Sequence, residues 1–274
     1  MNAFERILYV LSAEMERPQG YQLFHIISII SVFAVAAVFC FAFRKASAKT
    51  EKIILMSTWG LLVLLEIYRQ LVFSVNFKET VYWEYRWDSF PFQFCSSPLY
   101  LLPFAALPKN ENFRDVIRMF FATFSLFAGL AVVFYPDDVF STYIGISIQA
   151  MIHHGAMVVI GIFIGGQLVR EGKMTISRFI KASVVFYGLV IIALIMNLLA
   201  PLVTDMTFNM FFIGPNFPCH LVILDQIYAN VPYPLFLLIY MLGFTLAAFI
   251  MFWLQQLLRP AWYKSIKENR KTLV

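Results

Sequence analysis

Seven long apolar stretches alternate with short polar connections along this chain. They cover about residues 22–43, 52–75, 91–107, 116–135, 146–169, 180–203 and 234–258. Each is long enough for a helix to cross the hydrocarbon core of a bilayer. Lipid offers the backbone no hydrogen-bond partner, so every stretch is predicted to be helical. The pattern therefore predicts an all-α fold, a polytopic membrane helical bundle with seven transmembrane helices that forms a single integral membrane domain over 1–274.

The positions of the basic residues give an orientation. Most of the 21 Lys and Arg residues fall in the first, third and fifth connections and in the basic tail at 259–274. Only Arg6, Arg17, Lys78 and Arg86 fall on the other side, and Arg69 lies within a helix. Cytoplasmic connections are enriched in Lys and Arg, so the chain is predicted to be a multi-pass cell-membrane protein, N-out and C-in.

The composition agrees with this prediction. The chain of 274 residues is 61% hydrophobic and 14% charged, whereas an average soluble domain is about 45–50% apolar and about 25% charged. The topology explains the net charge of +5, so the basic tail is interpreted as a cytoplasmic anchor. We expect membrane lipids as partners, and no nucleic acid.

Two places interrupt the regular pattern. The third stretch is short and contains Pro98 and Pro103, each of which removes a backbone donor and kinks a helix. The sixth connection, 204–233, contains two apolar pieces, 208–213 and 221–227, that are too short to span. A re-entrant or interfacial segment on the outer face fits it best. The alternative is an ordinary outer loop that lies on the lipid surface.

Polar residues inside the apolar stretches are costly in a bilayer and are therefore functional candidates. In the predicted topology they come from five helices and the outer loop and lie at one level near the outer face. This level predicts a hydrated pocket that opens toward the outer leaflet, whereas no intramembrane charge is expected on the cytoplasmic side. The candidate substrate-binding residues are His25, Glu66, Arg69, Gln93, Gln149, His154, Asn197, Asn209 and Asp225.

Several of these residues have a structural alternative. Glu66 and Arg69 are three apart on a helix and can form an ion pair with each other. Asn197 can simply bond to the neighbouring backbone without serving a ligand, and His25 can reach the lipid headgroups. His153 and His154 diverge by about 100° on a helix, so we expect His153, which shares a face with Gln149, to point inward.

Cys95 and His153 are the candidate catalytic pair. A thiol beside a histidine can form a thiolate and an imidazolium, which prepares it for acyl transfer. The alternatives are that Cys95 is a small buried hydrophobe or that it forms a disulfide bond with Cys219. No metal or other cofactor is predicted, because His153-His154 and Cys219-His220 lack the spacing of metal ligands.

Several motifs together carry a family resemblance. They are Tyr21-Gln-Leu-Phe-His25, Phe90-Pro-Phe-Gln-Phe-Cys95, Asn209-Met-Phe-Phe212 and Leu221-Val-Ile-Leu-Asp225. The chain resembles the YwaF family of bacterial integral membrane proteins over nearly its whole length. That family is similar to a eukaryotic family of membrane acyltransferases that place polyunsaturated acyl chains on ether phospholipids using a cysteine and a histidine. The resemblance implies that Cys95 is the nucleophile and His153 the histidine. The chain departs from the family pattern at Gln93, Ser96 and Cys219-His220.

Three functional hypotheses follow. The first is a membrane-embedded acyltransferase or lipid-modifying enzyme, in which Cys95 takes an acyl group and His153 acts as general base and then acid. The second is a non-enzymatic transporter or sensor that binds a small polar solute in the same pocket. The third is a scaffold for other membrane proteins.

Overall fold

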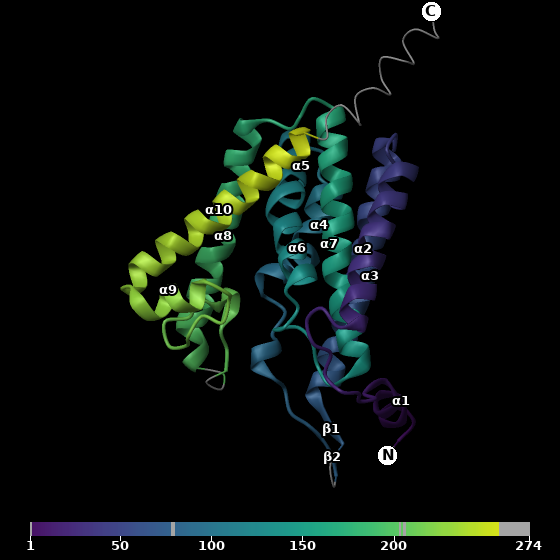
Figure 1. Cartoon of the computed structure of the whole chain (residues 1–274), viewed down its shortest axis with the longest axis vertical. Helices are drawn as coiled ribbons and strands as arrows, with labels where there is room; N and C mark the ends of the chain where they lie inside the picture. Colours follow the sequence, from purple (N-terminus) through teal and green to yellow (C-terminus); the bar gives the residue numbers. More distant parts are fainter. Residues whose placement is uncertain (1, 78–79, 203, 205–206, 258–274) are drawn as a thin grey trace, which may run out of the picture.

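Helices make up nearly all of the computed structural model, as the apolar pattern predicts (Figure 1). It describes residues 2–77, 80–202, 204 and 207–257, so the basic tail predicted at 259–274 lies outside the described residues. The only sheet among them is a two-stranded antiparallel hairpin, in which Val75 pairs with Trp83. The elements are α1 (Ala3–Leu11), α2 (Leu23–Ala42), α3 (Ala48–Ser74), β1 (Val75–Phe77), β2 (Val81–Trp83), η1 (Trp87–Ser89), η2 (Phe94–Ser96), α4 (Ser97–Ala106), α5 (Glu111–Phe120), η3 (Phe121–Ser125), α6 (Leu126–Phe134), α7 (Ile144–Arg170), α8 (Ile176–Leu199), η4 (Ala200–Leu202), η5 (Met210–Phe212), α9 (Leu224–Asn230) and α10 (Tyr233–Leu257).

A helix occupies each of the seven apolar stretches. Among the described residues, five helices are long and apolar enough to cross a membrane by length and composition: Leu23–Ala42, Glu111–Phe134, Ile144–Arg170, Ile176–Leu202 and Tyr233–Leu257. The second of these joins α5, the π-helical turn η3 and α6 into one continuous helix. The other two stretches are occupied by α3 and by the shorter apolar segment Phe94–Ala106.

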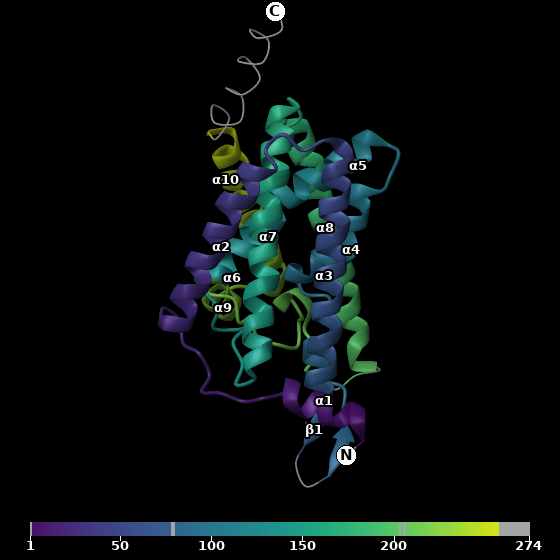
Figure 2. The ribbon, with the colours of Figure 1, turned by 90° about the vertical axis from the view of Figure 1, so that its right-hand side faces the viewer.

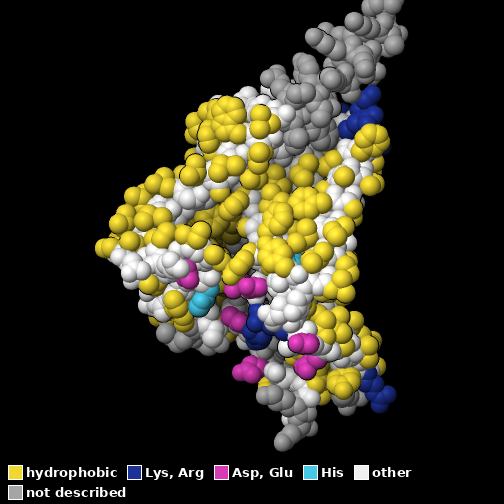
Figure 3. Space-filling model, viewed as in Figure 1, with side chains coloured by type: hydrophobic (Ala, Val, Ile, Leu, Met, Phe, Trp, Pro, Cys, Tyr) yellow, Lys and Arg dark blue, Asp and Glu magenta, His cyan; other side chains and the backbone are white. Residues whose placement is uncertain are grey.

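The exterior of the bundle is apolar where helices face outward. Only 22% of the apolar window is buried in α2, and the same share in α10. Hydrophobic side chains cover most of the face drawn in Figure 3, and the acidic and histidine side chains gather toward the end that holds the N-terminus. Such a surface is suited to contact with hydrocarbon rather than with water.

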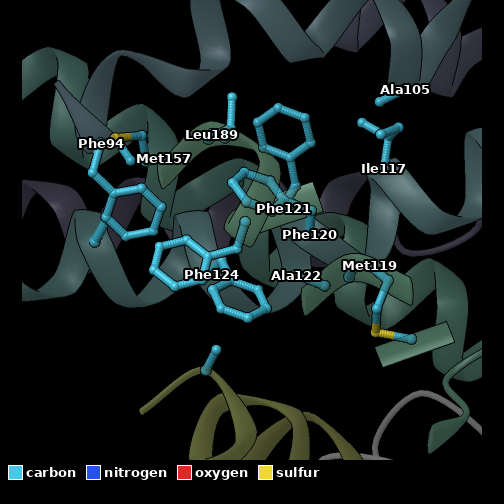
Figure 4. Packing of buried hydrophobic residues seen from close by; sticks show 14 of the residues in the cluster. Phe94, Ala105, Ile117, Met119, Phe120, Phe121, Ala122, Phe124, Met157 and Leu189 are labelled. Carbon is cyan, nitrogen blue, oxygen red and sulfur yellow. The ribbon is translucent and has the colours of Figure 1, made fainter. Parts of the chain in front are cut away.

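The interior is built around α7 and a cluster of phenylalanine rings. The apolar window of α7 is 78% buried, and the helix lies between α2 and α3 in Figure 2. Gly129 lets α6 approach α7 closely, since a Cβ there would lie 2.8 Å from the Cβ of Met157. The Phe124 ring stacks on Phe120 at 5.6 Å (Figure 4) and on Phe186 at 4.9 Å.

The third apolar stretch is less regular than a single helix over 91–107. Its helix α4 begins only at Ser97, with Pro98 in the first turn, where a missing N–H costs nothing. Pro103 lies inside α4 and cannot donate to the carbonyl of Leu99. The indole Nε1–H of Trp59 on α3 donates to that carbonyl at 2.9 Å instead. The break is thereby satisfied, and Cys95 is left just before the N-terminal end of α4.

The sixth connection folds back onto the bundle. Met210, Phe211 and Ile213 are buried, and the Phe211 ring lies 5.6 Å from that of Phe94. Phe211 and Phe212 both have a left-handed backbone, with φ of 59° and 56°, a conformation that costs energy for residues with a side chain. The described part of the connection then continues to α9, which has no buried residue.

Candidate functional site

Cys95 and His153 lie next to each other although 58 positions separate them in the sequence. His153 is on α7, 4% exposed, and its Nε2 lies 2.9 Å from the carbonyl oxygen of Cys95. A carbonyl oxygen only accepts, so Nε2 carries the proton and donates. This bond fixes the imidazole against the backbone of Cys95, which is itself half-buried. The positive end of the α4 dipole favours negative charge on the neighbouring thiol.

The other nitrogen of His153 is free. Nδ1 is buried and has no hydrogen-bond partner among the described residues. With Nε2 protonated, Nδ1 of the neutral ring holds a lone pair and can accept a proton. The adjacent His154 is equally buried, donates through Nδ1 to the Ala150 carbonyl at 2.7 Å, and leaves its Nε2 without a described partner. Gln149 is buried one turn from His153 on α7.

Glu66 and Arg69 form an ion pair with each other. The guanidinium approaches the Glu66 carboxylate at 2.9–3.2 Å through Nη2 and Nε. Arg69 Nη2 and Gln70 Nε2 also donate to the carbonyl oxygen of Ser89 at 2.8 and 2.7 Å. The pair therefore connects α3 to the segment that leads into Cys95. Glu66 and Arg69 form the ion pair that was the structural alternative to a substrate-binding role.

The side-chain amides of Gln93, Asn197 and Asn209 form hydrogen bonds with the backbone of the sixth connection. Gln93 accepts from the N–H of Phe211 and donates to the carbonyl of Asn209, at 2.8 and 2.9 Å. Asn197 makes the same two-way contact with Met210 at 2.7 and 2.9 Å. The Asn209 side chain accepts from Gly214 N at 2.7 Å. These bonds hold the left-handed residues in place beside Cys95.

Two candidates lie apart from this group. His25 has no exposed surface, accepts from Tyr21 N through Nδ1 and donates to the Val133 carbonyl through Nε2, both at 2.8 Å. It fastens the start of α2 to the end of α6. Asp225 is exposed in the first turn of α9 and caps the N–H of Gln226 at 2.7 Å.

Other polar atoms near Cys95 were not singled out by sequence reasoning. Ser97 Oγ, Gln70 Oε1 and the hydroxyl of Tyr240 are buried without a described hydrogen-bond partner. Tyr240 stacks on Phe244 at 4.5 Å, and Phe244 lies 5.2 Å from Phe94. Tyrosine and serine occur throughout the apolar stretches, so only the fold shows which of them are near the cysteine.

A second polar cluster lies at the opposite end of the bundle, where no intramembrane charge was expected. Asp115 and Arg118 on α5, beside the expected start of the fourth span, are 1% and 3% exposed. Arg118 donates to Asp115 and to Glu171 at 2.8–3.0 Å, and its Nε forms an ion pair with Glu51 at 2.7 Å outside hydrogen-bond geometry. Lys173 pairs with Asp115 and Glu171 at 3.0 and 3.2 Å. We call these residues the Arg118 network.

The network shifts the pKa values of its members in the connection between α7 and α8. Burial alone would raise the pKa of Glu171, but the hydrogen bonds and charges of Arg118 and Lys173 outweigh it and lower that pKa below its ordinary value. Burial would lower the pKa of Lys173, but the hydrogen bonds that its ammonium donates to Asp115 and Glu171 raise it instead.

The three cysteines are all free thiols, so Cys95 and Cys219 form no disulfide bond. No group of three His, Cys, Asp or Glu side chains is arranged for a metal ion within the described part of the chain.

The comparisons with known proteins give a family and no further relative. No curated protein and no solved structure matches the chain. The sequence model of the TMEM164 family matches residues 20–254, which include four of the five candidate membrane helices, all but the last three residues of α10, and both members of the Cys95–His153 pair. With its apolar helices and exterior, this match makes the protein a multi-pass membrane protein that belongs to the TMEM164 family.

Proposed function

We propose that this protein is a membrane acyltransferase that uses Cys95 as nucleophile and His153 as base on membrane lipids. The observation that carries the proposal is the state of His153. One nitrogen is anchored on the carbonyl of Cys95, and the other is buried with no described partner. A histidine held against a cysteine with its lone pair unused is arranged to take a proton.

The first half-reaction loads the cysteine. His153 Nδ1 takes the proton of the Cys95 thiol, and the thiolate attacks the carbonyl carbon of a lipid ester. The ester C–O bond breaks, and the leaving oxygen takes the proton from Nδ1. The products are an acyl thioester on Cys95 and a lipid with a free hydroxyl.

The second half-reaction unloads it. The hydroxyl of an acceptor lipid gives its proton to His153 Nδ1 while its oxygen attacks the thioester carbonyl. The C–S bond breaks, and sulfur regains the proton. His153 would accept and return a proton in both half-reactions, with the donor lipid and with the acceptor lipid. The loop held by Gln93 and Asn197 would cover the reacting group.

The proposal includes a topology. Seven helices would cross the cell membrane, with α3 and α4 completing the set, and the N-terminus would lie outside. The helices alternate in direction between the two ends of the bundle in Figure 1, which supports an odd number of crossings. The motifs that resemble the YwaF family support the proposed acyl transfer, with departures from that family's pattern at Gln93, Ser96 and Cys219-His220.

The experiment uses the full-length protein in lipid nanodiscs and an acyl donor lipid with an alkyne in its chain. We expect transfer of the tagged chain to wild type and to Cys219→Ser, and none to Cys95→Ser. His153→Gln keeps an amide N–H that can donate to the Cys95 carbonyl but cannot accept a proton. It should slow loading by about 10²–10⁴-fold, the usual contribution of a general base.

His154→Gln is the matched histidine control, since His154 is the neighbouring residue and equally buried. Size-exclusion profiles establish that each variant is folded. Equal labelling of wild type and Cys95→Ser, or no labelling of either, would exclude the enzyme and favour a binder of polar solutes.

A further inference from the structure

A groove runs along the side of the bundle between α2 and α3, with α7 as its floor. Its volume is about 420 Å³, within the range of about 300–1,000 Å³ that small-molecule sites occupy. The two flanking helices diverge from their connection at 43–47, and α7 is visible between them in Figure 2. Ser31 and Leu61 stand exposed on opposite walls, so the groove is open to the outside.

The chemistry of the lining decides what fills this space. Its residues are apolar apart from Ser28, Ser31 and Thr58, and the Ser28 hydroxyl donates to the Phe24 carbonyl at 2.8 Å. Water needs two to four polar partners to be held in a cavity, and apart from these three hydroxyl groups the side chains of the lining offer none. Both α2 and α7 are candidate membrane spans, so the medium at this level is hydrocarbon. An empty groove would lose dispersion contacts on both walls, and an acyl chain restores them.

The groove continues toward the candidate site. Thr58, Ala156 and Ile160 line the groove and also a small void whose other wall includes Pro98. Pro98 is three residues after Cys95 in the first turn of α4, and Ala156 is one turn after His153 on α7. This void is too small to hold a water molecule, so side chains between α3 and α7 must move before a chain lying in the groove can direct one end toward Cys95.

We infer that this α2/α3 groove binds a single acyl chain of a membrane lipid and guides it to Cys95. The binding of the chain stands on the groove alone, and its purpose rests on the proposed acyl transfer. Headgroup chemistry plays no part in the recognition, since the lining carries no charged residue.

The test uses the full-length protein in nanodiscs that contain a phosphatidylcholine with a photoactivatable diazirine in one acyl chain. After irradiation, mass spectrometry locates the adducts. We expect them on the α2 and α7 peptides that line the groove, at a severalfold higher yield than on the equally outward-facing α10. Ser31→Phe fills the groove and should lower the yield there severalfold. Ala37→Phe is the matched control, because Ala37 is exposed on the same helix and does not line the groove.

Two further variants separate this inference from the proposed function. Cys95→Ser should keep the adducts in the groove while losing acyl loading. If wild type forms the adducts but Cys95 is never loaded, the proposed function is overturned and the binding of the chain in the groove stands. Ala156→Phe blocks the passage and should reduce loading of Cys95 severalfold while the outer adducts persist. Adducts spread evenly over the helices, or unaffected by Ser31→Phe, would reduce the groove to ordinary boundary lipid, and full loading of Ala156→Phe would overturn the guiding path.

Discussion

Two polar clusters are buried in this bundle, and they differ in how completely their groups are paired. In the Arg118 network every described carboxylate faces at least one cation, and the contacts run from 2.7 to 3.2 Å. Around Cys95, His153 Nδ1, His154 Nε2 and Ser97 Oγ have no described hydrogen-bond partner, whereas in the network this holds only for Arg118 Nε, which still faces the Glu51 carboxylate at 2.7 Å. Burying a polar group without a partner costs free energy, so a cluster that leaves several unpaired is not explained by stability. Ion pairs of the first cluster join α3, α5 and the connection after α7, and we propose that the second cluster keeps capacity for a ligand or a reaction.

Arg118→Met is the substitution that tests the structural role of the Arg118 network most strongly. It would leave Glu51 and Asp115 buried without their main cation, which costs about 3–5 kcal/mol when one partner of a buried pair is removed. We expect a large drop in the temperature at which the protein loses its size-exclusion peak after heating. Arg114→Met is the control, since its pair with Glu111 spans 3.5 Å and Glu111 is 71% exposed. Such surface pairs contribute about 0–1 kcal/mol. Equal effects of both substitutions would refute a structural role for the network.

Asn197→Ala tests the support of the loop beside Cys95. It leaves the buried N–H and carbonyl of Met210 unpaired, at about 1–3 kcal/mol for an unsatisfied buried group. The left-handed residues Phe211 and Phe212 should then lose their fixed geometry. Faster hydrogen exchange over 207–214 would show it, with Asn230→Ala on exposed α9 as the control that leaves this exchange unchanged. Unchanged protection in Asn197→Ala would mean that ring packing alone holds the loop.

The pH dependence of stability tests the Arg118 network through a smaller effect. The lowered pKa of Glu171 contributes stability that is present above its ordinary value of 4.5 and is lost as pH falls through the folded value. The raised pKa of Lys173 contributes stability that is present below 10.5 and is lost as pH rises through the folded value. Glu171→Gln should flatten the acid limb of a plot of melting temperature against pH, and Lys173→Met the alkaline limb. A plot with the wild-type acid limb in Glu171→Gln would show that other carboxylates dominate.

The sequence predicted the helical elements well, because their driving force is local. Long apolar stretches must be helical in lipid, so α2, α7, α8 and α10 begin and end within a few residues of the expected positions. It was less successful at α4, since the effect of Pro98 and Pro103 depends on whether another element, here Trp59, satisfies the freed carbonyl. The hairpin of β1 and β2 gave no clear signal in three-residue strands.

The candidate site was predictable in part for a similar reason. Depth along helices placed Cys95 and His153 at one level, and the contact between them agrees with it. Depth cannot say which partner a side chain chooses. Gln93, Asn197 and Asn209 could serve a ligand or the backbone, and only the path of residues 207–214 shows that they bond to the backbone. Arg118 sits close to a predicted span boundary, so its burial depended on how Glu51 and Glu171 packed around it.

The most direct measurement is the mass of the Cys95 peptide after the nanodisc protein is incubated with an acyl donor lipid and no acceptor. If Cys95 is the nucleophile, we expect an adduct with the mass of one acyl chain on Cys95. Hydroxylamine should remove it, as it removes a thioester, and His153→Gln should strongly reduce it. An unmodified Cys95 under conditions where the lipid is present in the groove, or an adduct formed equally well in His153→Gln, would contradict it.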